Sequence, residues 1–247
     1  MSRPTIVALL FDVFGTVVDW RTSIIRELAA FGTAHGLQAD WERIADEWRG
    51  EYQPAMEEVR SGRREWTILD LLHRESLTRV FERHGITALP EVDLDQLTRA
   101  WHRLDPWADA VAGLTRLKER FIIGTLSNGN VGLLTRLARH GRLPWDVILS
   151  AETAHAYKPL PDAYLRNAAL LNLRPGEIML VAAHNSDLDA ASQVGFRTAF
   201  VARPTEHGPH QTTDLTATGA WDLVASDLRE LAAALVPDRA DHAPGAA

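Results

Sequence analysis

Short apolar runs recur along this chain and constrain its fold more than any other feature. The first covers residues 5–11, and a run of this kind is typical of a strand buried on both faces of a parallel sheet. Similar runs cover residues 121–126, 147–150, 178–183 and 198–202. Helical patterns at residues 131–139 and 161–171 lie between them. The alternation predicts an α/β fold with a Rossmann-like, doubly wound parallel sheet.

Residues 18–100 interrupt this alternation. The segment is rich in Trp, Glu, Arg and Leu, and three stretches within it could each place an apolar stripe on one helix face: residues 24–31, 41–59 and 66–84. Pro54 should kink or end the second of these helices. We interpret the segment as a helical cap inserted after the first strand. The alternative is that these helices pack directly on the sheet.

This interpretation predicts a core formed by residues 1–17 and 101–236 and a cap formed by residues 18–100. Residues 237–247 are rich in Pro, Ala and Gly and show no periodic pattern, which predicts a disordered tail. The chain has 247 residues, of which 46% are hydrophobic, so it can bury a sizeable core without disulfides or a structural metal.

Composition and charge exclude several kinds of function. The chain has no cysteine, which rules out disulfides, zinc–thiolate sites and cysteine nucleophiles. The net charge is −7 and basic residues alternate with acidic ones, so we expect no nucleic-acid partner. The apolar run at residues 6–11 is too short for a signal peptide or a membrane span. We expect a cytoplasmic protein with no membrane partner; its assembly stays open, with a homodimer among the alternatives.

Polar side chains follow the predicted strands, at the edge where open α/β sheets bind their ligands. Asp12 ends the first strand and precedes a turn that contains glycine. Ser127 and Asn128 end the second strand, Lys158 precedes a predicted helix, and Asp187 follows the fourth run. If Asp12 were only a turn former and Lys158 only a surface charge, this order of residues at strand ends would have no explanation.

These four motifs, in this order, resemble those of the haloacid dehalogenase superfamily, and the resemblance includes the inserted cap. It implies that Asp12 is a covalent nucleophile. Phosphatases of the superfamily carry a second Asp, a general acid, where this chain has Phe14, and a metal-binding Asp that aligns with Ala183. Magnesium needs several oxygen ligands. We therefore expect no metal and no cofactor, and displacement of halide from carbon in place of phosphoryl transfer.

The first motif, residues 12–16, is similar to that of the L-2-haloacid dehalogenases, also called type II haloacid dehalogenases. Their cap carries a Trp-Arg pair that supplies a halide-binding arginine, and Trp48-Arg49 stands in the corresponding predicted helix. More narrowly, residues 182–185 and 206–211 resemble members that include defluorinating, fluoroacetate-active enzymes.

The resemblance implies a two-step hydrolysis of short 2-haloalkanoic acids, the expected small-molecule partner. Asp12 would expel halide and form an aspartyl ester, which water would hydrolyse to the 2-hydroxy acid. Thr16 would orient Asp12, Lys158 would stabilise negative charge, and Asp187 would orient Lys158 or the water. The implied substrate- and halide-binding residues are Arg49, Ser127, Asn128, Phe14, Val13 and Asn185.

The chain departs from the best-known members of the family at three positions. They carry Ser and Asn where this chain has Ala182 and His184, and an aromatic residue where it has Ser186. His184 could assist the hydrolytic water, since an imidazole titrates near neutrality, or it could be a structural histidine. Two other functions remain as alternatives: a magnesium-dependent small-molecule phosphatase, which Phe14 and Ala183 disfavour, and a non-catalytic binding protein.

Overall fold

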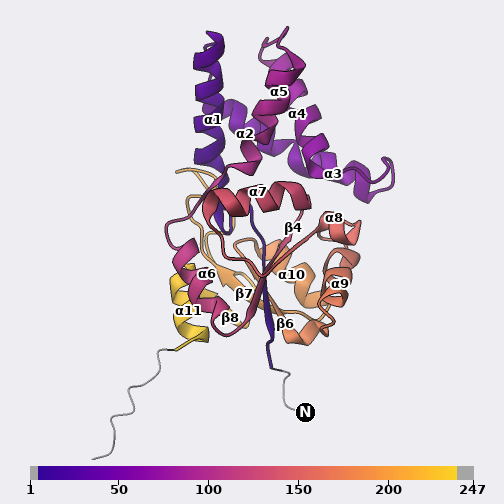
Figure 1. The fold of residues 1–247 in the computed structure, drawn as a ribbon, viewed down its shortest axis with the longest axis vertical. Helices are drawn as coiled ribbons and strands as arrows, with labels where there is room; N and C mark the ends of the chain where they lie inside the picture. Colours follow the sequence, from indigo (N-terminus) through magenta and orange to yellow (C-terminus); the bar gives the residue numbers. More distant parts are fainter. Residues whose placement is uncertain (1–4, 238–247) are drawn as a thin grey trace, which may run out of the picture.

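The computed structural model describes residues 5–237. Its main sheet is formed by β1 (Ala8–Phe11), β4 (Ile122–Ser127), β5 (Val147–Ser150), β6 (Ile178–Ala182), β7 (Arg197–Val201) and β8 (Leu223–Ala225). The strand order is β5–β4–β1–β6–β7–β8, and all neighbours run parallel. Helices cover both faces, and a further group of helices lies beyond one end of the sheet (Figure 1). The predicted α/β fold with a doubly wound parallel sheet is confirmed.

The strands are buried on both faces because their apolar side chains alternate between two helical layers. Leu9 and Phe11 of β1 belong to the hydrophobic cluster of one face, and Ala8 and Leu10 to that of the other. The first layer contains α6 (Ala110–Lys118), α7 (Val131–Gly141) and α11 (Leu228–Leu235). The second layer contains α8 (Ala151–Ala154), α9 (Pro161–Leu170) and α10 (Asn185–Gln193).

Between residues 20 and 102 the chain folds into helices that lie beyond the sheet (Figure 1). They are α1 (Trp20–His35), α2 (Trp41–Gly50), α3 (Tyr52–Arg60), α4 (Leu69–Arg83), α5 (Glu91–Thr98) and the 3-10 turn η1 (Arg99–His102). The two segments that connect these helices to the rest of the chain pair with each other as the antiparallel strands β2 (Val18–Asp19) and β3 (Asp105–Pro106). The domain boundaries at residues 18 and 100 stay a prediction, and the predicted tail, apart from Pro237, lies outside the described residues.

Pro54 explains why the predicted helix at residues 41–59 is two helices. α2 ends at Gly50 and α3 begins at Tyr52. A proline ring clashes with the carbonyl four residues earlier, which here belongs to Gly50. Pro54 itself lies in the first turn of α3, where a missing N–H costs little.

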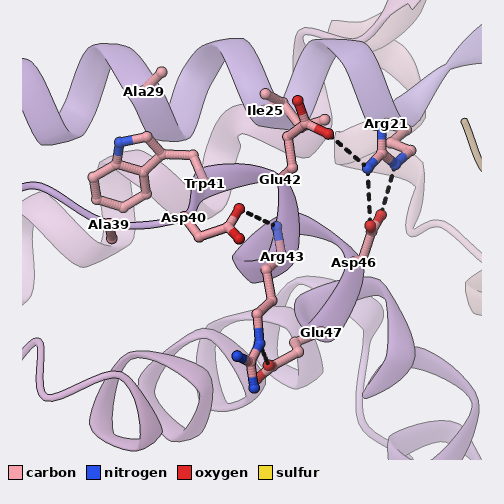
Figure 2. A pocket seen from close by; sticks show the side chains of 10 residues that line it. All are labelled: Arg21, Ile25, Ala29, Ala39, Asp40, Trp41, Glu42, Arg43, Asp46 and Glu47. Carbon is pink, nitrogen blue, oxygen red and sulfur yellow. Dashed lines mark hydrogen bonds and ion pairs between the residues drawn. The ribbon is translucent and has the colours of Figure 1, made fainter.

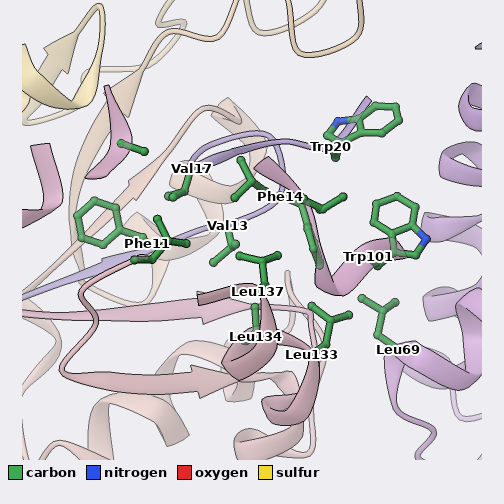
Figure 3. Packing of buried hydrophobic residues seen from close by; sticks show 14 of the residues in the cluster. Phe11, Val13, Phe14, Val17, Trp20, Leu69, Trp101, Leu133, Leu134 and Leu137 are labelled. Atoms are coloured by element: carbon green, nitrogen blue, oxygen red, sulfur yellow. The ribbon is translucent and has the colours of Figure 1, made fainter. Parts of the chain in front are cut away.

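One hydrophobic core joins the sheet to the helices beyond it (Figure 3). The Phe14 ring packs edge-on against Trp101, with 5.8 Å between centroids, and Trp101 stacks on Trp20 at 6.3 Å. Trp48 from α2 also contacts Trp101, at 5.4 Å. Burying such large rings fixes α1, α2 and η1 over the ends of the strands. In the described part of the chain, no helix is both long and apolar enough to cross a membrane.

A buried ion pair fastens the loop after β7 to the start of α6. Arg203 donates from its two terminal nitrogens to Asp109 at 2.9 and 2.8 Å, and from Nε to the carbonyl of Thr16 at 2.9 Å. Asp109 also accepts the N–H of Leu228 at 2.7 Å. We expect Asp109→Ala to lower the free energy of unfolding by about 3 kcal/mol, because it leaves the Arg203 guanidinium uncompensated. Urea denaturation followed by circular dichroism measures this loss.

Asp162→Ala is the matched control for that variant. It breaks an ion pair with Arg166 in which both side chains are more than half exposed, at 55% and 56%. Such a pair contributes at most about 1 kcal/mol, because water screens it. Equal losses in the two variants would show that the Asp109 pair is worth no more than a surface contact.

Candidate active site

A cavity of roughly 700 Å³ lies between the ends of the strands and helices α1 to α3. Most of the predicted site residues line it, namely Asp12, Phe14, Arg49, Asn128, Lys158, His184 and Asp187. Parallel pairing explains why residues so far apart in the sequence meet here. β4, β1 and β6 are adjacent, so the residues that follow them share one edge of the sheet.

The Asp12 carboxylate is bound on both oxygens. Lys158 donates from Nζ to Oδ1 at 2.9 Å, and Thr16 donates from its hydroxyl to Oδ2 at 2.9 Å. Nδ1 of His184 lies 3.1 Å from Oδ2. Burial by itself would raise the pKa of Asp12, but the Lys158 ammonium and the His184 ring outweigh it and hold the pKa well below its usual range. The carboxylate is therefore ionised at neutral pH, as a nucleophile must be.

Lys158 lies between two carboxylates. Its ammonium donates to Asp187 as well as to Asp12, and Tyr164 donates its hydroxyl to the other oxygen of Asp187 at 2.6 Å. Burial would lower the pKa of Lys158, but the two carboxylates raise it above its usual value, so the ammonium stays charged. The backbone N–H of Lys158 donates to the side-chain oxygen of Asn128 at 2.9 Å. Asp187 therefore contacts Lys158 directly, and its predicted role in orienting Lys158 or the water stays a prediction.

Glu206 is an acid of the site that sequence reasoning missed. Its carboxylate is buried, lies 2.9 Å from Nε2 of His184 and accepts the indole N–H of Trp20 at 3.1 Å. Gly15, at φ +83°, makes room for it, since a Cβ there would lie 2.1 Å from a carboxylate oxygen. Burial would lower the pKa of His184, but Glu206 and Asp12 raise it well above its usual value. His184 is thus a cation between two carboxylates.

Arg49 reaches the cavity from α2. Its guanidinium lies 4.0 Å from the ring centre of Tyr52 and 5.4 Å from that of Trp20. Its Nη1 is buried and, among residues 5–237, has no hydrogen-bond partner. A buried, positively charged hydrogen-bond donor without a partner costs free energy unless an anion binds to it. This makes Arg49 the side chain of the cavity best suited to receive an anionic group.

Three residues predicted to bind substrate are absent from the cavity lining. Val13 is fully buried in the core, and the Ser127 hydroxyl, also buried, accepts the N–H of Gly129 at 3.2 Å. The Asn185 amide is occupied elsewhere, and its predicted part in substrate binding stays a prediction that these contacts do not support. The amide donates to Asp214 at 2.8 Å and accepts from the indole of Trp221 at 2.9 Å, so it holds the loop before β8.

Arg60 was not predicted either, and it ties the helices to the sheet side of the cavity. Its guanidinium donates to the carbonyl of Lys158 at 2.8 Å and to the side chain of Gln53 at 3.1 Å. All three residues line the cavity. α3 is therefore anchored next to the residue that neutralises Asp12.

A second hollow lies between α1 and α2, and its charges are paired with one another (Figure 2). Arg21 is bound by Asp46 at 2.7 Å and by Glu42 at 3.2 Å. Arg43 is bound by Glu47 at 2.9 Å. These pairs leave little charge to attract a ligand, whereas the cavity over Asp12 contains the unpaired nitrogen of Arg49. The cavity over Asp12 is the candidate active site.

Comparison with known proteins identifies the family. Residues 6–195 match the family model described as haloacid dehalogenase-like hydrolase. The match spans more than half of the chain, so the protein belongs to this family of hydrolases.

Within the family, the chain is similar to L-2-haloacid dehalogenases. The crystal structure of the defluorinating L-2-haloacid dehalogenase Rha0230 has a TM-score of 0.92 and 52% identity, and the match covers 93% of this chain and 95% of that one. The crystal structure of the L-2-haloacid dehalogenase PA0810 has a TM-score of 0.90 and 48% identity, and the match covers 93% of this chain and 98% of that one. (S)-2-haloacid dehalogenase 1 of Pseudomonas sp. (strain CBS-3) is 30% identical over 200 residues, 79% of this chain and 84% of that protein. The resemblance inferred from the sequence motifs is confirmed.

Proposed function

We propose that this protein hydrolyses the carbon–halogen bond of short 2-haloalkanoic acids and releases the 2-hydroxy acid, as an (S)-2-haloacid dehalogenase does. One observation carries the proposal: an ionised Asp12 carboxylate opens into a cavity that also contains the unpaired guanidinium nitrogen of Arg49. The first supplies a nucleophile and the second an acceptor for the departing halide. The similarity to Rha0230 supports fluoroacetate as one of the substrates.

In the first step, an Asp12 oxygen attacks the α-carbon of the substrate. A carbon–oxygen bond forms, the carbon–halogen bond breaks, and the halide leaves with the bonding electron pair toward Arg49. Thr16 and Lys158 hold the carboxylate in one orientation, which lowers the entropic cost of reaching the transition state. The amide nitrogen of Asn128 is suited to bind the substrate carboxylate, since its oxygen already accepts from Lys158.

In the second step, water attacks the carbonyl carbon of the Asp12 ester. The bond between that carbon and the alkyl oxygen breaks, so the product keeps an oxygen that belonged to Asp12. The configuration at the α-carbon inverts once, during halide displacement. Lys158 offsets the negative charge that builds on the carbonyl oxygen.

Halide release from chloroacetate, fluoroacetate and the two 2-chloropropionate enantiomers tests the activity. A single turnover in heavy-oxygen water then tests the route. We expect the label in the Asp12 carboxylate, detected by peptide mass spectrometry, and an unlabelled first product. Label in the first product would mean that water attacks carbon directly, and no halide release from any compound would reject the function.

Activity should be independent of metal ions. Phe14 and Ala183 occupy the positions at which phosphatases of the superfamily carry their general acid and a magnesium ligand. Within residues 5–237, no three His, Asp or Glu side chains are arranged to hold a metal ion. Exhaustive treatment with a chelator should leave halide release within about twofold of the untreated rate, since no Lewis acid takes part. Loss of activity that magnesium restores would favour the phosphatase alternative.

A cytoplasmic location and a homodimeric assembly are further proposals. Cell fractionation tests the first. Size-exclusion chromatography with light scattering tests the second, with a mass of twice 27.4 kDa expected for the dimer.

A further inference from the structure

His184 is held between two acids at the centre of the site. Nδ1 lies 3.1 Å from Asp12, and Nε2 lies 2.9 Å from Glu206. Beyond Glu206, the ring of His207 lies 3.5 Å from the carboxylate. One ring nitrogen therefore meets the carboxylate that becomes the ester. The other meets a buried carboxylate that has no role in the two steps above.

We propose that Glu206 is a positioning residue that holds His184 as the proton acceptor for the water that hydrolyses the Asp12 ester. The inference rests on the proposed function and adds to it the base of the second step. Nδ1 faces the carboxylate whose carbon the water must attack, and a bond from Nε2–H to Glu206 fixes this orientation of the ring. Glu206 acts through His184 and does not touch the reacting atoms.

Asp187 is less suited to be this base. One of its oxygens accepts from Lys158 and the other from Tyr164, so both are occupied and one faces a cation. His184 has no such cationic neighbour within hydrogen-bond distance among the described residues, and its two partners are anions.

Ester formation itself prepares the base. In the resting enzyme, Asp12 and Glu206 together raise the pKa of His184, so the ring carries a proton. Alkylation removes the negative charge of Asp12, which removes one of the two causes of that raised pKa. The ring can then release its proton to solvent and become neutral. The base is thus available only after the first step, when water must be activated.

The proton balance closes over one turnover. Water adds to the ester carbon and gives one proton to Nδ1 of His184. The carbon–oxygen bond breaks, and the imidazolium returns that proton to the leaving alkoxide, which becomes the hydroxyl of the product. The new Asp12 carboxylic acid, whose pKa is held low, gives its remaining proton to His184 and restores the resting state. The net products are the 2-hydroxy acid, the halide and one proton, which was released when the ester formed.

The surroundings of Glu206 are built to hold a charged group in a buried place. A carboxylate at 1% exposure is costly unless it is paired. Trp20 donates to it, Gly15 leaves space for it, and the pair between Arg203 and Asp109 anchors its loop. The Trp20 indole alone would need only a neutral acceptor, so this contact does not explain a charged residue here.

Glu206→Gln tests the inference, because it keeps the size of the side chain and removes its charge. We expect one equivalent of halide to be released in the first turnover at nearly the wild-type rate. Hydrolysis of the ester should slow by about 10²-fold, the lower end of the contribution of a general base. Intact-protein mass spectrometry should then detect an Asp12 adduct during turnover of chloroacetate. Glu42→Gln, an exposed acid on α2, is the matched control and should behave as wild type.

A double variant shows whether Glu206 acts through His184. His184→Gln should accumulate the same adduct, and Glu206→Gln in that background should slow hydrolysis no further. If Glu206→Gln fails to fold, as judged by circular dichroism, the His184→Gln adduct decides the test. The inference would be overturned if either single variant hydrolysed the ester at the wild-type rate, or if the losses in the two single variants multiplied in the double variant. In both cases, halide release by the wild-type protein would leave the proposed function intact. Absence of halide release by the wild-type protein would overturn both.

Discussion

Asp12→Asn should lower kcat for every haloacid by about 10⁴-fold or more, the scale on which enzymes lose activity when a covalent nucleophile is removed. An amide nitrogen or oxygen is a far weaker nucleophile than the ionised carboxylate, whose pKa the neighbouring Lys158 and His184 hold low. The fold should survive, since asparagine keeps the size of the side chain and can still accept from Thr16. Halide release measured with an ion-selective electrode gives the rate.

The control for this variant is Asp189→Asn, an exposed acid on α10 whose side chain bonds only to a neighbouring glutamine in the described part of the chain. It should retain wild-type kinetics. Slow deamidation of the amide introduced by Asp12→Asn, which mass spectrometry detects as a gain of about one dalton, would restore activity in proportion to the converted fraction. Such recovery would still identify the carboxylate as the active group. Undiminished halide release by protein that has not deamidated would contradict the assignment of Asp12 as nucleophile.

The architecture was predictable because a strand buried on both faces leaves a distinctive mark on the sequence. The uninterrupted apolar runs at β1, β4 and β6 arise because each side chain meets one of two helical layers. β8 was not predicted because it lacks this burial on both faces. It has three residues at the edge of the sheet, and Val224 at its centre is 58% exposed, so no run of buried residues marks it.

The centre of the site was predictable from the same logic. Asp12 and Asp187 follow adjacent parallel strands, so their order along the chain indicated a shared location, and the resemblance supplied Lys158. Glu206 follows β7 in the same way, but no role was assigned to it. The rule for strand ends, applied to that strand as well, would have named it as a candidate.

The directions of the side chains could not be predicted from the sequence. Asn185 is adjacent to His184, yet its amide turns to the loop of Asp214 and Trp221 because those groups satisfy it. The contact of Arg60 with the carbonyl of Lys158 joins two segments that no local pattern connects. Such directions depend on which distant partners complete each hydrogen bond, and a single sequence does not contain that information.

Arg49 is expected to contribute most where the carbon–halogen bond is hardest to break. Negative charge grows on the departing halide, and a guanidinium in a partly dry cavity can stabilise it without rearranging water. Arg49 is suited to this because its Nη1 is buried without a partner among the described residues, while Tyr52 supports its plane at 4.0 Å. Fluoride concentrates its charge in the smallest volume, so it should gain more from this donor than bromide does.

Arg49→Lys should therefore lower kcat by about 10²-fold, the effect of losing one preorganised donor in an active site. Lysine keeps the positive charge but loses the planar fork and the stacking on Tyr52. The loss should be greater for fluoroacetate than for bromoacetate, which rules out a general defect in folding as its cause, since such a defect would affect both substrates equally. Arg43→Lys is the control: it lies on the same helix, is 70% exposed and pairs only with Glu47 in the described structure, and it should leave both rates unchanged. Wild-type kinetics of Arg49→Lys on both substrates would mean that another cation of the cavity receives the halide. After Lys158, protonated His184 is the cation nearest to Asp12.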